Sequence, residues 1–251
     1  MVRGLLLVSL CFTPAIPSNA TTAIALRSRY RIVLAADSRA VYGSSRDATE
    51  CKLFEIRDVY ATVSGLAHYG SAFRATDAVR DGFSRPGSFQ THVSATAYYL
   101  RQRVAALLSQ LQRGNPAGYR ALMPPTNARA DFVALAVAQT MNGEPMLGIV
   151  ELQRVNGTNG FTARTTICPG NCRQGDGLFY LGYWERITPY VANSGQPRSV
   201  GSAASIDRLI RLEIQAHPAE VAAPINILEL SGSGARWLQN GGNCSLPNVG
   251  W

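Results

Sequence analysis

Residues 21 to 65 read TTAIALRSRYRIVLAADSRAVYGSSRDATECKLFEIRDVYATVSG, and this stretch decides the fold. It holds four runs rich in β-branched and apolar residues, each pair separated by a short polar turn: Thr22–Leu26, Arg31–Ala36, Leu53–Ile56 and Val59–Val63. Paired runs of this kind are typical of antiparallel β-hairpins. The stretch therefore predicts two hairpins at the start of a β-rich domain.

The ends of these hairpins away from their turns carry polar and small residues. If the first hairpin is centred on its turn, Thr21 lies beside Asp37. A second hairpin centred in the same way places Lys52 roughly opposite Gly65. We therefore expect these four residues to lie close together, brought there by strands of one sheet.

Beyond residue 65 the sequence continues with helix-like and strand-like segments. Helical spacing or β-rich composition predicts helices over Ala67–Phe83, Thr91–Leu111 and Ser202–Gln215, and strands over Phe132–Gln139, Pro145–Val155, Leu178–Tyr183, Ile225–Leu230 and Ala235–Gln239. The segment between the third of these strands and the last helix is expected as a long loop. This order indicates the α+β class, with a sandwich of two sheets covered by helices.

Composition indicates one globular domain of ordinary size. The chain has 251 residues, of which 46% are hydrophobic and only 16% are charged. The formal charge of +8 is spread as single arginines, and no aromatic-basic motif of a nucleic-acid-binding fold is present. We therefore expect neither a nucleic-acid partner nor a membrane-spanning segment in the mature protein.

The first twenty residues have the pattern of a secretory signal peptide. Arg3 gives a positive start, Leu5–Phe12 is a short apolar run, and Ser18-Asn19-Ala20 offers small residues for cleavage after Ala20. We expect a leader at residues 1–20, a single domain at residues 21–251, and a secreted or periplasmic protein.

Removal of the leader would leave four cysteines, at positions 51, 168, 172 and 244. An even number in an exported protein permits two disulfides. Cys168 and Cys172 flank a tight loop that a bridge could close, whereas the pairing of Cys51 with Cys244 does not follow from the sequence. A metal or redox role is not indicated, and we expect neither a metal nor a cofactor.

Lys52 is the only lysine in a chain whose other 23 positive residues are all arginine. Arginine stays charged, whereas the pKa of a lysine responds to burial and neighbouring charge. A lone lysine on a solvated face needs no function. A single lysine kept in a chain that otherwise uses arginine, however, is a candidate for a functional-site ammonium whose pKa is shifted by its surroundings.

Cleavage after Ala20 would make Thr21 the first residue, with a hydroxyl and a free α-amine in one residue. A threonine hydroxyl is a weak nucleophile, and an N-terminal amine is a known general base for it. The pKa of a free α-amine is about 7.7–8.0, and a nearby Lys52 ammonium, oriented by Asp37, would lower it. Gly65 has no Cβ, so its N–H can approach a developing oxyanion.

These residues resemble the N-terminal third of proteasome β-type subunits, which are N-terminal nucleophile hydrolases. The resemblance lies in Thr21–Ala25, Val33–Ala40, Lys52–Ile56 and Ala61–Gly65. It implies a four-layer αββα sandwich of two antiparallel sheets. By matched position it implies catalysis by Thr21, Asp37, Lys52 and Gly65, a substrate side-chain pocket at Val63, and backbone hydrogen bonds from Val41 to an extended peptide.

The chain also departs from this family. Ala20 precedes the nucleophile where the family usually has glycine, and Leu181–Trp184 carries no counterpart of the family's late serine. Glu220 is the nearest candidate for its distal acid. The resemblance leaves open a homo-oligomer, although a single exported subunit has no evident ring partner.

The expected function is therefore an exported threonine hydrolase that cleaves peptide or other amide bonds. Two alternatives stay open: a non-catalytic binding or scaffold protein with the same fold, and an amidase or acylase that acts on small molecules.

Overall fold

The computed structural model describes residues 21–42, 45–123, 131–155, 160–172, 177–194, 201–242 and 244–245, with backbone alone at 40–42, 45–48 and 194. The expected leader, residues 1–20, lies outside the described residues. Within the described part, no helix is both long and apolar enough to cross a membrane.

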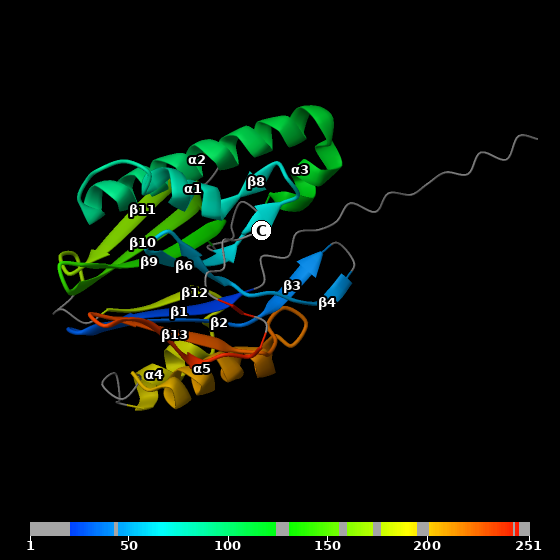
Figure 1. Ribbon diagram of the computed structural model, residues 1–251. Coiled ribbons are helices and arrows are strands. Elements are labelled where there is room, and N and C mark those ends of the chain that lie inside the picture. The colour runs from blue at the N-terminus through cyan, green and yellow to red at the C-terminus, as the bar shows by residue number, and fades with distance from the viewer. Residues whose placement is uncertain are drawn as a thin grey trace, which may run out of the picture.

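Two five-stranded antiparallel sheets form the centre of the molecule (Figure 1). The first, called the β1 sheet, has the order β12-β1-β2-β13-β14, with β1 at Thr22–Arg27, β2 at Arg31–Ala36, β12 at Gly177–Gly182, β13 at Asn226–Ser231 and β14 at Gly234–Gln239. The second, called the β6 sheet, has the order β11-β10-β9-β6-β5, with β5 at Leu53–Ile56, β6 at Val59–Gly65, β9 at Val133–Met141, β10 at Glu144–Arg154 and β11 at Phe161–Cys168.

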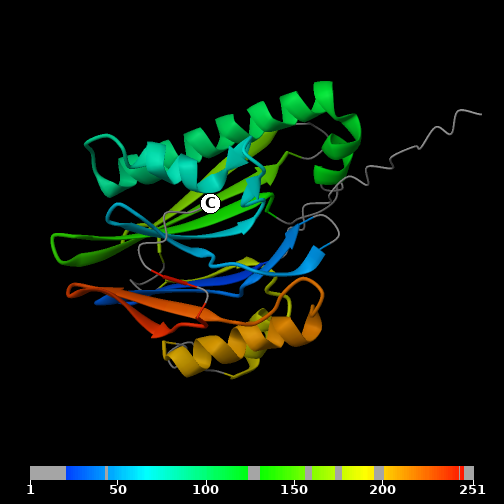
Figure 2. The ribbon, with the colours of Figure 1, turned by 45° about the vertical axis from the view of Figure 1, so that its right-hand side comes forward.

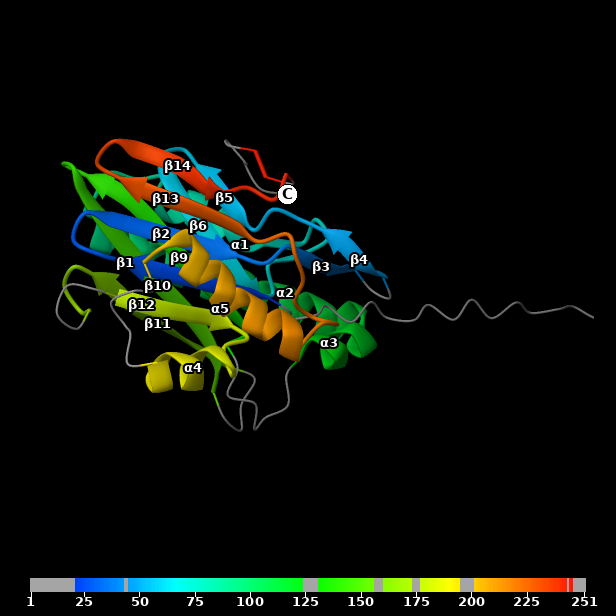
Figure 3. The ribbon, with the colours of Figure 1, turned by 90° about the horizontal axis from the view of Figure 1, so that it is seen from below.

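Helices lie on the outer face of each sheet (Figures 1 and 2). The β6 sheet is covered by α1 (Ala75–Gly82) and α2 (Phe89–Gly114), which α3 (Pro116–Leu122) follows. The β1 sheet is covered by α5 (Ala203–Ala216) and α4 (Ile187–Ser194), which lie beneath it in Figure 1 and on the side toward the viewer in Figure 3. The structure thus confirms the predicted α+β class with two antiparallel sheets.

Alternation along the central strands explains how the two sheets pack. On β9, Ala134, Ala136 and Ala138 face the other sheet, whereas Val133, Leu135 and Val137 face the helices. β1 follows the same rule, with Ala23 and Ala25 between the sheets and Ile24 toward the helices. Successive side chains of a strand point to opposite faces, so small residues on one face let two sheets approach closely.

Most predicted strands agree with the structure, but the register of the hairpins differs from the prediction, by one residue in the first and by two residues in the second. In the first, Ala23 pairs with Ala36, so the register differs from the prediction by one residue. In the second, Leu53 pairs with Thr62, so continuing the ladder places Lys52 opposite Val63 and not Gly65. The expectation of one shared sheet was also wrong, because the hairpins belong to different sheets.

Several short elements differ from the prediction. The helix expected from Ala67 begins only at Ala75, because residues 68–74 form a small hairpin of β7 (His68–Tyr69) and β8 (Phe73–Arg74) that turns through Gly70 at φ +51°. β11, α3, and a hairpin of β3 (Arg39–Tyr42) and β4 (Ser45–Thr49) were not predicted.

The four cysteines form two disulfides, Cys51–Cys244 and Cys168–Cys172. The second closes the tight loop identified in the sequence, at the end of β11. The first joins the residue before Lys52 to a segment beyond β14, and so connects the two sheets covalently.

Candidate functional site

Thr21, Asp37 and Lys52 meet between the two sheets. The Lys52 ammonium nitrogen Nζ lies 3.0 Å from Thr21 Oγ1 and 3.0 Å from Asp37 Oδ1. Thr21 stands just before β1, Asp37 just after β2, and Lys52 just before β5. Their exposed fractions are 4%, 0% and 6%, so the ion pair is almost entirely out of water. The sequence prediction that these three residues lie together is thus confirmed, by a contact across the sheets.

The Asp37 carboxylate is held by four donors. Oδ1 accepts from Lys52 and from the backbone N–H of Thr22, at 2.9 Å. Oδ2 accepts from the backbone N–H groups of Arg39 and Ala222, at 2.9 and 3.3 Å. Hydrogen bonds to an ionised carboxylate stabilise its charge and fix its orientation. Asp37 is therefore a rigid anion aimed at Lys52.

Burial lowers the pKa of Lys52 below its usual value, and the nearby carboxylate of Asp37 only partly offsets this effect. Glu50 also raises this pKa, while the positive charge of Arg39 lowers it. A low-dielectric site disfavours the charged form of an amine, whereas an adjacent anion favours it. Lys52 thus has the tunable ammonium that the chain's arginines cannot provide.

The backbone of Thr21 is fixed from the other side by the segment after β12. Tyr183 N–H donates to the Thr21 carbonyl oxygen at 2.9 Å, and Thr22 Oγ1 donates to the Tyr183 carbonyl at 3.1 Å. Gly182 has φ +81°, and a Cβ placed on it would lie 1.8 Å from the Thr21 carbonyl oxygen. Only glycine fits this close approach, so Gly182 is a site residue that sequence reasoning missed.

Gly65 ends β6 with φ +77°, and a Cβ there would lie 2.5 Å from the Phe132 carbonyl oxygen. This contact accounts for glycine at the position on structural grounds alone. Its assignment as the oxyanion donor stays a prediction.

The two residues expected to contact substrate are placed differently. Val63 is buried in the core cluster between the β6 sheet and helices α1 and α2. Val41 falls where the β3–β4 ladder is interrupted, between the pairs made by Ala40 and Tyr42, and its side chain is outside the described part. Neither placement tests a role in substrate binding.

A second polar cluster lies beyond Tyr183. Glu213, fully buried on α5, accepts through Oε1 from the backbone N–H groups of Arg186 and Ile187, at 2.6 and 2.9 Å. It thereby caps the start of α4, which explains why a helix forms where the sequence predicted a loop. The His217 ring packs against the Tyr183 ring, with centroids 4.5 Å apart.

The Tyr183 phenol keeps its proton to higher pH than usual. Burial raises its pKa, as do the carboxylates of Glu220 and Glu185. Glu220, the candidate for the distal acid, thus influences the pKa of Tyr183 through its charge. The spacing of Glu213 and His217, one helical turn apart, was the signal that could have identified this cluster.

Among the described residues, no group of three or more His, Cys, Asp or Glu side chains is arranged to hold a metal ion. No protein-family model matches the chain, and no curated protein matches it either.

Proposed function

We propose that the protein is an N-terminal threonine hydrolase that cleaves peptide or other amide bonds, with the αββα fold of the N-terminal nucleophile hydrolases. The observation that carries this proposal is the position of the Lys52 ammonium, 3.0 Å from both Thr21 Oγ1 and Asp37 Oδ1 in a site almost free of water.

The contact between Lys52 and Thr21 favours nucleophilic attack. Lys52 Nζ donates to the hydroxyl oxygen, so it stabilises the negative charge that grows on Oγ1 as the proton leaves. The hydroxyl proton must then go to a base other than Lys52. In a chain that begins at Thr21, the α-amine of the same residue supplies that base, at a pKa of about 7.7–8.0 before the ammonium lowers it.

The remaining steps follow from this chemistry. Thr21 Oγ1 attacks the carbonyl carbon of the amide, and the N–H of Gly65 stabilises the resulting oxyanion. The α-ammonium returns its proton to the leaving amine, which gives an ester on Thr21. Water, activated by the same amine, then hydrolyses that ester and frees the hydroxyl.

This mechanism requires that residues 1–20 be removed. As long as the peptide bond before Thr21 is intact, its nitrogen is an amide and has no basic lone pair. We propose that signal peptidase cuts after Ala20 during export, so that secretion itself produces the active enzyme.

N-terminal sequencing of the secreted protein and two variants test the proposal. The mature chain should begin at Thr21. Thr21→Ser should keep amide hydrolysis, because it keeps both the hydroxyl and the amine, whereas Thr21→Ala should abolish it. If a folded Thr21→Ala variant hydrolyses amide substrates as fast as the wild type, the mechanism is wrong. A scaffold protein would show no hydrolysis from any of the three chains.

A further inference from the structure

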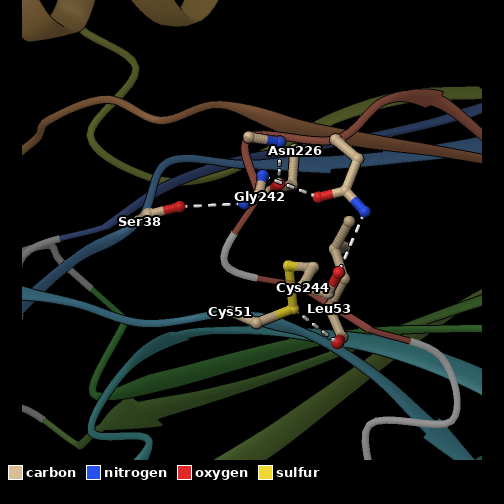
Figure 4. The surroundings of a disulfide bond; sticks show 8 residues. Ser38, Cys51, Leu53, Asn226, Gly242 and Cys244 are labelled. Atoms are coloured by element: carbon tan, nitrogen blue, oxygen red, sulfur yellow. Dashed lines mark hydrogen bonds between the residues drawn. A yellow bond between two sulfur atoms is a disulfide. The ribbon is translucent and has the colours of Figure 1, made fainter.

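The segment after β14 bridges the two sheets beside the ion pair. We call residues Asn240–Gly242 and Cys244 the strap. Cys244 forms the disulfide with Cys51, with Cα atoms 5.0 Å apart and both cysteines buried (Figure 4). Cys51 directly precedes Lys52, so this end of the strap holds the backbone that carries the ammonium.

The other end of the strap holds the backbone that carries Asp37. Gly241 N–H donates to Asn226 Oδ1 at 2.8 Å, and Asn226 Nδ2 donates to Ser38 Oγ at 2.9 Å (Figure 4). Ser38 directly follows Asp37, and both Ser38 and Asn226 are buried. The strap therefore reaches the residue next to each member of the ion pair, Cys51 directly through the disulfide and Ser38 through Asn226.

Hydrogen bonds within the strap also fix its conformation. Asn240 Nδ2 donates to the Cys244 carbonyl at 2.9 Å, and Gly242 N–H donates to Asn240 Oδ1 at 2.9 Å. A Cβ on Gly241 would lie 2.1 Å from the Cβ of Pro224, so the backbone at this position is packed directly against Pro224, just before β13 of the β1 sheet. A segment with this many fixed contacts can transmit a constraint from one sheet to the other.

We propose that the strap is a positioning device, which holds Lys52 in register with Thr21 and Asp37 across the sheet interface. This inference rests on the proposed function. Elsewhere that interface is largely apolar and lined by alanines, which give the sheets few directional contacts. Positioning matters because a displacement of about 1 Å in a catalytic group can cost on the order of 100-fold in rate.

The first experiment compares two double variants. Cys51→Ala with Cys244→Ala removes the bridge at the strap, whereas Cys168→Ala with Cys172→Ala removes the bridge at β11 as a matched control. In the strap variant we expect kcat to fall at least about tenfold while KM stays within about twofold. In the control variant, kcat should equal that of the wild type.

A second measurement does not depend on activity. Because Lys52 is the only lysine, ¹⁵N-lysine labelling gives a single Nζ signal, whose titration reports its pKa. Loosening the strap should admit water to the ammonium and move this pKa up toward about 10.4, whereas the control variant should titrate like the wild type. If the wild type hydrolyses no amide, the proposed function fails, but the titration still decides whether the strap positions Lys52.

Reduction of the folded protein covers the case in which the strap variant does not fold. The control variant is treated with dithiothreitol, which gives two hydrogens to Cys51 and Cys244 and closes into its own cyclic disulfide. Both kcat and the Nζ titration should change as in the strap variant, and Asn226→Ala should change them in the same direction. If the bridge is broken and only the melting temperature falls, with kcat and the titration unchanged, the disulfide only stabilises the fold and the proposal is overturned.

Discussion

Two groups of residues hold Thr21 from opposite sides, and they differ in how completely their buried polar atoms are hydrogen-bonded. The ion-pair end consists of Asp37 and Lys52, and the helix end consists of Tyr183, Glu213 and His217. At the ion-pair end, both carboxylate oxygens of Asp37 accept two hydrogen bonds each. At the helix end, Glu213 Oε2 has no hydrogen-bond partner among the described residues, and His217 Nε2 lies between two carboxylates, at 3.7 Å from Glu213 and 3.2 Å from the exposed Glu185.

This difference separates a preorganised site from a structural anchor. A buried polar group without a partner carries a desolvation cost, whereas a fully bonded carboxylate is fixed in place. We infer that the ion-pair end performs the chemistry and that the helix end positions the segment which holds the Thr21 backbone.

The largest effect is expected for Asp37→Asn. The substitution leaves the buried Lys52 ammonium without its anion, and breaking a buried pair in this way costs about 3–5 kcal/mol. Urea denaturation of the wild type and the variant measures the loss. Asp81→Asn, which removes a half-exposed partner of Arg103, is the control and should cost no more than about 1 kcal/mol. Equal losses in the two variants would contradict the importance of the buried pair.

Lys52→Arg should leave the protein folded but reduce kcat on the order of 100-fold, the scale of a lost donor to a developing negative charge. Arginine keeps the charge for Asp37, but its planar guanidinium cannot be tuned by burial and does not fit a compact ammonium site. Steady-state kinetics beside Thr21→Ala, which gives the background rate, measures this effect. Wild-type activity in the arginine variant would remove Lys52 from the mechanism.

Glu213→Gln should act mainly on stability. The amide oxygen can still accept from Arg186 N–H and Ile187 N–H, but the negative charge at the start of α4 is lost, which we expect to cost about 1–2 kcal/mol. Thermal unfolding measures the cost, and Asp81→Asn, which lies outside this cluster, is again the control. A decrease in kcat of more than about tenfold, at full folding, would place Glu213 in the catalytic machinery.

The smallest effect concerns pH. Because burial lowers the folded-state pKa of Lys52, the unfolded chain binds this proton more tightly. The contribution of Lys52 to the free energy of unfolding therefore rises as pH increases from the lowered pKa toward about 10.4. The melting temperature of the wild type, relative to Lys52→Gln, should increase as the pH rises toward about 10.4. A constant difference would mean that the ammonium is hydrated.

The hairpin strands and the ion-pair end could be predicted because their signals are local. β2 and β5 coincide with their predicted ranges, since β-rich runs end at polar turns. The register could not be predicted, because turn geometry sets it and strands buried on both faces, such as β1 and β2, lack the alternation that would fix it. Lys52 lies beside Asp37 as predicted, although the register was different, because the contact forms between the two sheets and not within one.

The helix end was missed for a different reason. Glu213 caps α4 from another helix, α5, so no pattern at the start of α4 marks the cap, and the one-turn spacing of Glu213 and His217 was the available local signal. Gly182 is likewise explained only by the approach of Thr21, which is far away in sequence. Long-range contacts of this kind override local propensity.

The disulfide of the strap also has a consequence for the order of biosynthesis. Cys51 and Cys244 are 193 residues apart, so a ribosome that adds about 5–20 residues per second makes the second cysteine roughly 10–40 seconds after the first. During this time β5 and β6 can pair, but the crosslink beside Lys52 cannot form. A nascent or truncated chain that stops before residue 244 thus carries Thr21, Asp37 and Lys52 without the bond that secures them, and the bridge marks a chain as complete through β14.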